Sequence, residues 1–178
     1  FQELVARDIE SKAVISQLVY PGPRYHYLMG RFIGIMCLVA GAQLVSACDL
    51  AIANEQASFC TPGVNIGAFC TTPLVGIGRN MHRKHAMQMA LTGDTLSAAD
   101  AVRFGLINDA VPAEDLIASV QALAAKIAGK SAQAIRGGKE AFYRQIDMPL
   151  EQAFRAATEA MLQGLTSGEA AEGTRAFL

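Results

Sequence analysis

The sequence predicts an α/β domain followed by a helical C-terminal region. Residues 41–111 alternate short apolar runs, such as "CDLAIAN", with segments whose apolar residues recur at helical spacing. From residue 113 onward, Ala and Leu recur at helical spacing almost without interruption. The 178 residues suit one domain, and the 52% apolar and 17% charged composition predicts a sizeable core.

The first 40 residues contain one expected helix and an apolar stretch. Apolar residues of 1–19 fall mostly three or four apart, which predicts an amphipathic helix. The "YPGP" sequence at 20–23 ends it. Residues 25–39 are apolar, partly β-branched or aromatic, and predict one or two strands.

The middle of the chain carries the clearest alternation. "GAQLVSA" predicts a short helix that opens on Gly41, and two strands are expected at 48–54 and 58–60. Residues 71–80 predict a helix with Thr at its cap and Pro in its first turn. Residues 82–93 predict another helix, which ends at a glycine.

Residues 96–105 carry the best-marked helix, because Ser97 and Asp100 resemble a capping box and Gly105 ends the segment. "LINDAV" at 106–111 predicts a strand. Helical spacing then predicts helices at 113–128, 131–146 and 149–165, and a last one from about Ser167.

Composition and charge argue against several classes of protein. The net charge is −1 and the basic residues are scattered, which disfavours nucleic-acid binding. The apolar run 32–45 is too short to span a bilayer. No two of the four cysteines have CxxC spacing, so no zinc or redox site is expected, and a reducing intracellular compartment fits best. Cys48 and Cys60 lie in apolar runs and are expected to be small core residues.

Several motifs resemble those of the enoyl-CoA hydratase/isomerase (crotonase) superfamily. They are "AGAQLVSACDLAIAN", "ASFCTPGVNIGAF", "ALTGDTLSAADAVRFGLINDAVP" and the closing "EGTRAFL". The resemblance covers residues 40–178 and implies a crotonase-like ββα spiral core of the ClpP/crotonase type. It implies a partial spiral core at 1–112 and a C-terminal helical trimerisation region at 113–178. Homotrimers, often paired into hexamers, are expected in the cytoplasm or, in a eukaryote, in the mitochondrial matrix.

The resemblance also implies a site for an acyl-CoA thioester. Family members stabilise a thioester enolate with two backbone N–H donors. The first donor corresponds to Ala40, and Gly41, Pro62, Asn65 and Thr71 are the expected substrate-binding residues. The second donor, and much of the adenine and pantetheine site, come from a front region that this sequence does not include. A tight turn before a helix, or turn stabilisation by Asn65, would explain the same residues without function.

The two glutamates used by the family's hydratases are missing. Gln43 stands at the first glutamate position and Gly63 at the second, and the region near Thr71 offers only hydroxyls and a thiol. Losing such acid–base groups costs on the order of 10²–10⁴-fold in rate per group. Water addition by the two-glutamate route is therefore not expected. Glutamate at both positions should restore hydration if the remaining scaffold is intact.

Three functions remain open from the sequence. The first is an acyl-CoA enzyme of fatty acid metabolism, a lyase or isomerase, that uses the oxyanion turn alone or with Cys70 or Thr71; Cys70 could equally be a packed thiol. The second is a non-catalytic acyl-CoA-binding or regulatory homologue, and the third is a structural subunit. No metal, nicotinamide or other cofactor is expected beyond the CoA thioester itself.

For several other polar residues a structural or solvent-exposed role is expected, with a functional role as the alternative. The basic helix start "RNMHRKH" is expected to be a solvated face, with a subunit or phosphate contact as alternatives. Asp49 is expected to be a structural carboxylate, and Lys139 could reach a CoA phosphate.

The stretch 21–41 departs from the family pattern, with Arg24, His26 and Arg31 where a buried strand is expected. We hypothesise a frameshift there. Resequencing of the coding DNA tests it, and the absence of a family-like strand in the other frames would refute it.

Overall fold

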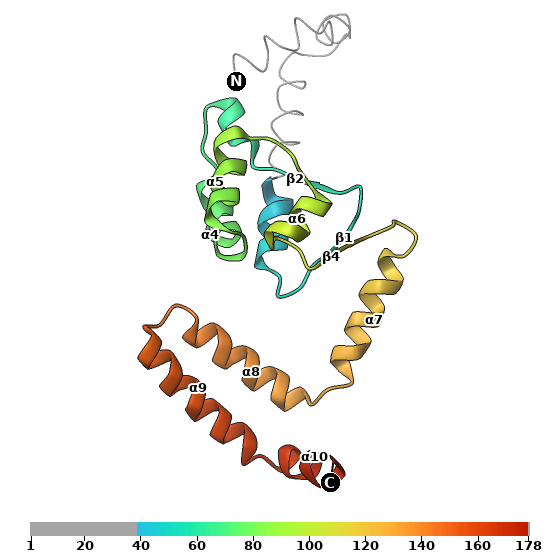
Figure 1. The fold of residues 1–178 in the computed structure, drawn as a ribbon, viewed down its shortest axis with the longest axis vertical. Helices are drawn as coiled ribbons and strands as arrows, with labels where there is room; N and C mark the ends of the chain where they lie inside the picture. Colours follow the sequence, from blue (N-terminus) through green and yellow to red (C-terminus); the bar gives the residue numbers. More distant parts are fainter. Residues whose placement is uncertain (1–38, 178) are drawn as a thin grey trace, which may run out of the picture. The chain divides into compact units, whose positions relative to one another are not determined.

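The computed structural model describes residues 39–177 (Figure 1). The helix expected at 1–19, the strands expected before residue 39 and the frameshift hypothesis lie outside these residues. Contacts divide the chain into two compact units, Phe1–Ser119 and Val120–Leu178. The first unit contains the short strands and the candidate site, and the second is helical.

The first unit alternates strands and helices, as the sequence predicts. Its described part opens with helical backbone at 39–47. The elements that follow are β1 (Ile52–Asn54), β2 (Ser58–Phe59), the 3-10 helix η1 (Pro62–Ile66), α4 (Thr71–Asn80), α5 (Arg83–Thr92), β3 (Leu96–Ser97), α6 (Ala98–Phe104) and β4 (Asp109–Val111).

Two small sheets connect segments that are far apart in the sequence. β1 pairs in parallel with β4, with Ile52 opposite Asp109. β2 pairs antiparallel with β3, with Ser58 opposite Ser97. A parallel pair requires a long crossover connection, and here the connection contains η1 and helices α4 to α6. The strand–helix alternation predicted from the sequence thus corresponds to a parallel strand pair joined by a helical crossover connection.

The helix-ending glycines and the capping box are confirmed. Gly93 ends α5 with φ 68° and Gly105 ends α6 with φ 87°, a left-handed conformation that glycine adopts without strain. The Ser97 hydroxyl accepts a hydrogen bond from the backbone N–H of Asp100 at 3.1 Å and donates to its carboxylate at 2.9 Å. Helix α4 begins and ends where it was predicted, although Cys70, and not a threonine, is its N-cap residue.

Three predicted boundaries are wrong, for identifiable reasons. The first helix does not open on Gly41, because residues 39 and 40 are already helical. The strand predicted at 106–111 is reduced to Asp109–Val111, because the N–H groups of Leu106 and Ile107 cap α6 by donating to the Ala101 carbonyl at 2.8 and 3.3 Å. Leu96–Ser97 forms a strand with β2 instead of the start of a helix.

The strand predicted at 48–54 is also shorter, because only Ile52–Asn54 pairs with another strand. Residues 48 and 49 bend away from the preceding helix, and the Cys48 N–H bonds the Val45 carbonyl at 3.2 Å. Cys48 is exposed, so its expected place in the core is wrong, whereas Cys60 is buried as expected.

The core of the first unit joins the first helix, β2 and helices α4 to α6. Ile77 and Ala101 are completely buried there. The cluster also contains Ala42, Phe59, Met81, Ala86, Met89, Leu106 and Ile107. The loop between Cys60 and Cys70 therefore connects β2 and α4, which both contribute residues to this core.

The second unit consists of helices near the predicted positions. They are α7 (Leu116–Ala128), which crosses the boundary between the units, and α8 (Ala132–Gln145), α9 (Leu150–Leu165) and α10 (Gly168–Phe177). Helices α8 and α9 pack against each other. Ala153 is the one residue of α7 to α9 that is buried. Across residues 39–177, no helix combines the length and the apolar character needed to cross a membrane.

Candidate functional site

The first helix carries three of the predicted site residues. Ala40, Gly41 and Gln43 are all exposed on it. The described residues begin inside this helix, at residue 39. A β-carbon built on Gly41 would meet nothing within 4 Å, so no side chain packs over this position.

The loop between Cys60 and Cys70 is tightly closed. Thr61, Pro62 and Gly63 are buried, and the Thr61 hydroxyl donates to the Met89 carbonyl of α5 at 3.3 Å. The Ala68 N–H donates to the Gly63 carbonyl at 2.9 Å. Gly67 ends the 3-10 turn with φ 77°. The uncharged, turn-rich sequence thus forms a compact loop against the core.

Gly63 has no room for a side chain. A β-carbon built on it would lie 2.6 Å from the Cys70 Sγ and 2.7 Å from the Ala68 carbonyl oxygen. Both distances are shorter than real β-carbon contacts, and the second atom belongs to the backbone and cannot rotate away. A glutamate at position 63 would therefore require the loop to move. The expectation that glutamate at both positions restores hydration requires an intact scaffold, and these contacts indicate that a glutamate at position 63 would disturb it.

The two thiols of the loop have different environments. Cys60 is 7% exposed, and this burial raises the pKa of its thiol, with a smaller contribution from the nearby Cys70 thiol. A raised pKa keeps Cys60 neutral and unreactive near pH 7. Cys70 is half-buried, and its sulfur packs over Gly63. This contact supports the packed-thiol interpretation of Cys70.

The remaining predicted residues lie at separate points of the loop. Pro62 is buried. Asn65 lies against the end of α5, since a β-carbon built on Gly93 would be 2.9 Å from its Nδ2. Thr71 is exposed at the start of α4, and its N–H donates to the Phe69 carbonyl at 2.8 Å. The structure thus places Cys70 against Gly63, and it places Asn65 against the end of α5.

Gln43 is connected to α4 through residues that the sequence did not single out. The Ser46 hydroxyl donates to the Gln43 carbonyl at 2.8 Å, and Asn80 Nδ2 donates to the Ser46 carbonyl at 2.7 Å. Gly76 of α4 faces Ser46 without a side chain in between. A glycine within a helical pattern indicates close packing, so Gly76 was the signal available in the sequence.

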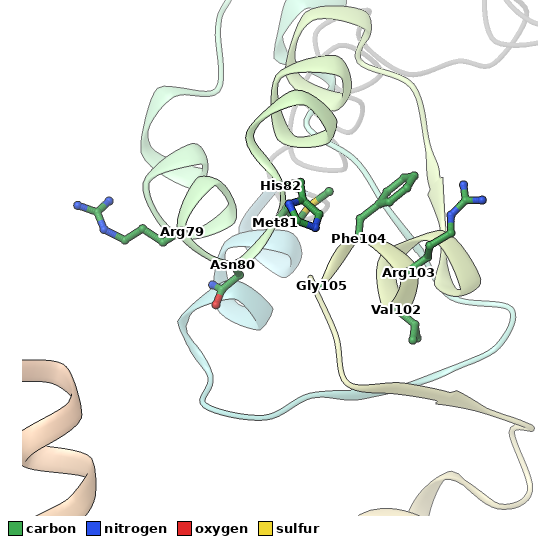
Figure 2. Close-up of a pocket in the computed structure, with 8 residues that line it drawn as sticks. All are labelled: Arg79, Asn80, Met81, His82, Val102, Arg103, Phe104 and Gly105. Carbon is green, nitrogen blue, oxygen red and sulfur yellow. The ribbon is translucent and has the colours of Figure 1, made fainter. Parts of the chain in front are cut away.

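A small cavity lies between the end of α4, the start of α5 and the end of α6 (Figure 2). Its volume is about 360 Å³, and its lining includes Arg79, His82 and Arg103. The Arg79 guanidinium donates to the Val75 carbonyl at 2.9 Å, and the Arg103 guanidinium pairs with Asp100 at 2.6 Å. Figure 2 shows the two arginines extending in opposite directions. They do not converge on a common phosphate position.

The basic helix start is mainly a solvated face. Arg79, His82, Arg83 and Lys84 are exposed. His85 differs, because its ring stacks on Phe104 with 3.6 Å between the ring centroids. Asp49 is exposed, as is Lys139 of α8. Within residues 39–177, no group of three or more His, Cys, Asp or Glu side chains is arranged to hold a metal ion.

Comparison with known proteins identifies the family. The enoyl-CoA hydratase/isomerase family model matches residues 34–178. Enoyl-CoA hydratase domain-containing protein 3, mitochondrial, of Rattus norvegicus is 43% identical over 143 residues, which are 80% of this chain and 48% of that protein. A probable enoyl-CoA hydratase of Mycobacterium tuberculosis is 33% identical over 79% of this chain and 55% of its own length. The chain spans about half the length of the curated relatives it matches.

Solved structures give the same family and the fold. The human enoyl Coenzyme A hydratase domain-containing protein 3 is 40% identical, with a TM-score of 0.75 over 78% of this chain and 55% of that one. An enoyl-CoA hydratase of Mycobacterium smegmatis is 34% identical, with a TM-score of 0.76 over 90% of this chain and 70% of that one. The fold is thus the predicted crotonase-like α/β fold. This chain belongs to the enoyl-CoA hydratase/isomerase family.

Proposed function

We propose that this chain forms part of an acyl-CoA thioester site that does not add water by the two-glutamate route. Family membership supports a thioester ligand, and relatives carry the name enoyl-CoA hydratase. The closed loop around Gly63 is the observation that argues against water addition by the two-glutamate route. It holds no carboxylate, a side chain at position 63 would collide with Cys70 and the Ala68 carbonyl, and Gln43 stands where the other glutamate is expected.

The proposed chemistry depends on the backbone of the first helix. The Ala40 N–H, next to Gly41, donates to the thioester oxygen and stabilises negative charge that develops on it. The positive end of a helix favours the same charge. Asn65, Pro62 and Thr71 contact the ligand along the loop. The CoA thioester is the only small molecule the site requires, and any activity is that of a lyase or isomerase in fatty acid metabolism.

We further propose that the complete protein is a homotrimer or a hexamer in the mitochondrial matrix. The second unit supports self-association, because apolar side chains such as Phe154, Met161 and Leu162 are 58–67% exposed. The location is supported by the printed names of the relatives from rat, mouse, frog, human and zebrafish, which include "mitochondrial".

The test compares crotonyl-CoA with free CoA, which lacks the thioester carbonyl. The chain is expected to bind crotonyl-CoA more tightly in calorimetric titrations. Ala40→Pro removes the N–H donor and should abolish the preference, whereas Ala40→Gly retains the donor and should keep it. Equal affinity of the unmodified chain for both molecules would refute the thioester site.

A structural role is the second candidate, and the exposed apolar side chains of the second unit favour it. In that case the chain would associate with copies of itself and bind neither molecule. Analytical ultracentrifugation alongside the same titrations separates the two functions.

A further inference from the structure

We infer that Asn80 is a positioning residue for the proposed thioester site, because its amide ties the helix that carries Ala40 to α4. Asn80 is the last residue of α4. Its Nδ2 donates to the Ser46 carbonyl at 2.7 Å and to the Gly76 carbonyl at 2.9 Å. Figure 2 shows its side chain beside the pale blue first helix. The inference rests on the function proposed above.

The Ser46 carbonyl is one of the last four carbonyls of the first helix, and these have no partner within a helix. Asn80 supplies that partner from another element. Both amide hydrogens are used, one on each helix, which fixes the orientation of the side chain. The contact therefore connects two helix ends that are 34 residues apart in the sequence.

Close packing at Gly76 reinforces the connection. A β-carbon built on Gly76 would collide with the Ser46 hydroxyl and lie 3.1 Å from the Ser46 β-carbon. Ser46 is itself buried at 7% exposure, and its hydroxyl donates to the Gln43 carbonyl. The end of the first helix therefore packs directly against the backbone of α4 at Gly76, where any larger residue would collide with Ser46.

The backbone of Asn80, whose side chain is exposed, also lies close to the end of α6. A β-carbon built on Gly105, at the end of α6, would lie 2.9 Å from the Asn80 carbonyl oxygen. Three elements therefore converge on Asn80: the first helix, α4 and the end of α6. Close packing of three elements, together with the two hydrogen bonds of Asn80, opposes sliding of the first helix along α4.

The effect reaches Ala40 because a helix moves as a rigid rod. Ala40 lies six residues before Ser46, or about 9 Å along the axis at 1.5 Å per residue. A shift or tilt at the Ser46 end changes the direction in which the Ala40 N–H points. Misplacement of a reacting group by about 1 Å can cost on the order of 10²-fold in rate. In this proposal Asn80 acts on the site only through the helix that carries Ala40.

The experiment measures the ratio of affinities for crotonyl-CoA and free CoA. Asn80→Asp preserves shape but removes both amide donors, and it should reduce the ratio at least threefold while leaving the affinity for free CoA unchanged. Asn54→Asp is the matched control: its Oδ1 accepts from the Gln56 N–H at 2.9 Å, a function that aspartate retains, so it should not change the ratio.

Two further variants keep the test decisive if Asn80→Asp does not fold. Gly76→Ala leaves Asn80 intact but pushes Ser46 away, and it should lower the ratio in the same way. Adding Ser46→Ala removes the colliding hydroxyl and should restore part of the ratio.

An unchanged ratio in Asn80→Asp and Gly76→Ala would overturn the inference. An equal loss of affinity for both molecules would also overturn it, because it would indicate only a structural role. A ratio of one in the unmodified chain would instead refute the proposed function, on which the inference rests.

Discussion

The two units differ in where their apolar side chains lie. In the first unit, Ile77 and Ala101 are completely buried, and strand β2 and the helices share one core. In the second unit, Leu150 and Phe154 of α9 are 74% and 67% exposed. Both units contain helices that the sequence predicted. The difference teaches that helical periodicity in the sequence specifies that a helix forms, but does not by itself specify that the apolar side chains of that helix are buried.

The largest effect on the free energy of unfolding is expected from a substitution in the core of the first unit. Ile77→Ala leaves a cavity and should lower the free energy of unfolding by about 2–5 kcal/mol. Leu162→Ala in α9 removes a side chain that is 58% exposed and should change it by less than about 0.5 kcal/mol in the isolated chain. Urea denaturation measures both. A large cost at Leu162 would show that this face is covered in solution.

Introducing the two family glutamates should cost stability without restoring chemistry. Gly63→Glu places a β-carbon against Cys70 and the Ala68 carbonyl, and overpacking of this kind costs about 1–3 kcal/mol or more. Gln43→Glu alone lies on an exposed position and serves as the control for stability. Hydration of crotonyl-CoA should be undetectable in the double variant. Its appearance would show that the loop accommodates a carboxylate after all.

Glycine-to-alanine changes sharpen the same contrast between the units. Gly105→Ala introduces a side chain at φ 87° and against the Asn80 carbonyl, so it should destabilise the chain by about 1–3 kcal/mol. Gly137→Ala lies in α8 with nothing within 4 Å and should stabilise that helix by about 0.4–1 kcal/mol. Thermal unfolding distinguishes the two directions, and a stabilising Gly105→Ala would contradict the close approach at α6.

The cap hydrogen bonds should cost about the same in both units, because a cap is a local interaction, although the Ser131 hydroxyl also donates to Glu169 of α10. Ser97 caps α6 and Ser131 caps α8, each by accepting a backbone N–H at 3.1 and 3.0 Å. Substitution of either serine by alanine should cost about 1 kcal/mol. Hydrogen exchange in α6 and α8 measures each cap separately. A cost confined to one unit would contradict the view that local helix signals are equally effective in both.

The buried thiol of Cys60 is expected to make the stability of the first unit depend on pH. Burial raises the pKa of Cys60 above its ordinary value of 9.0 in the folded chain. The unfolded chain therefore loses the Cys60 proton at a lower pH than the folded chain does. Stability from this group is complete below pH 9 and falls as the pH rises toward the folded value. Cys60→Ala should flatten this fall in urea denaturation, whereas Cys48→Ala, at an exposed thiol, should leave it in place.

The sequence predicted the features that are controlled locally. Ser97, Gly93 and Gly105 marked helix ends correctly, because capping and left-handed conformations depend on a few adjacent residues. Strand lengths were less predictable, since Leu106 and Ile107 cap a helix although their apolar run resembles a strand. Pairing partners are needed to decide between these outcomes, and a partner is not encoded in the segment itself.

The candidate site was predictable in composition and not in geometry. Gln43 and Gly63 could be identified as positions without an acid from the motifs alone. The collision of a residue-63 side chain with Cys70 and Ala68 depends on how the loop closes, which no spacing rule specifies. The hydrogen bond from the Asn80 amide to Ser46 joins residues 34 positions apart, so it likewise could not be predicted from local sequence.

The central claim is that the family's thioester site remains here without its acid–base pair. Calorimetric titration of crotonyl-CoA into the chain at high protein concentration tests it most directly, because binding gives a heat that saturates and turnover gives a heat that persists. We predict a saturable heat that returns to baseline after each injection. A persistent heat, with water added to the double bond, would contradict the account, and so would the absence of any heat.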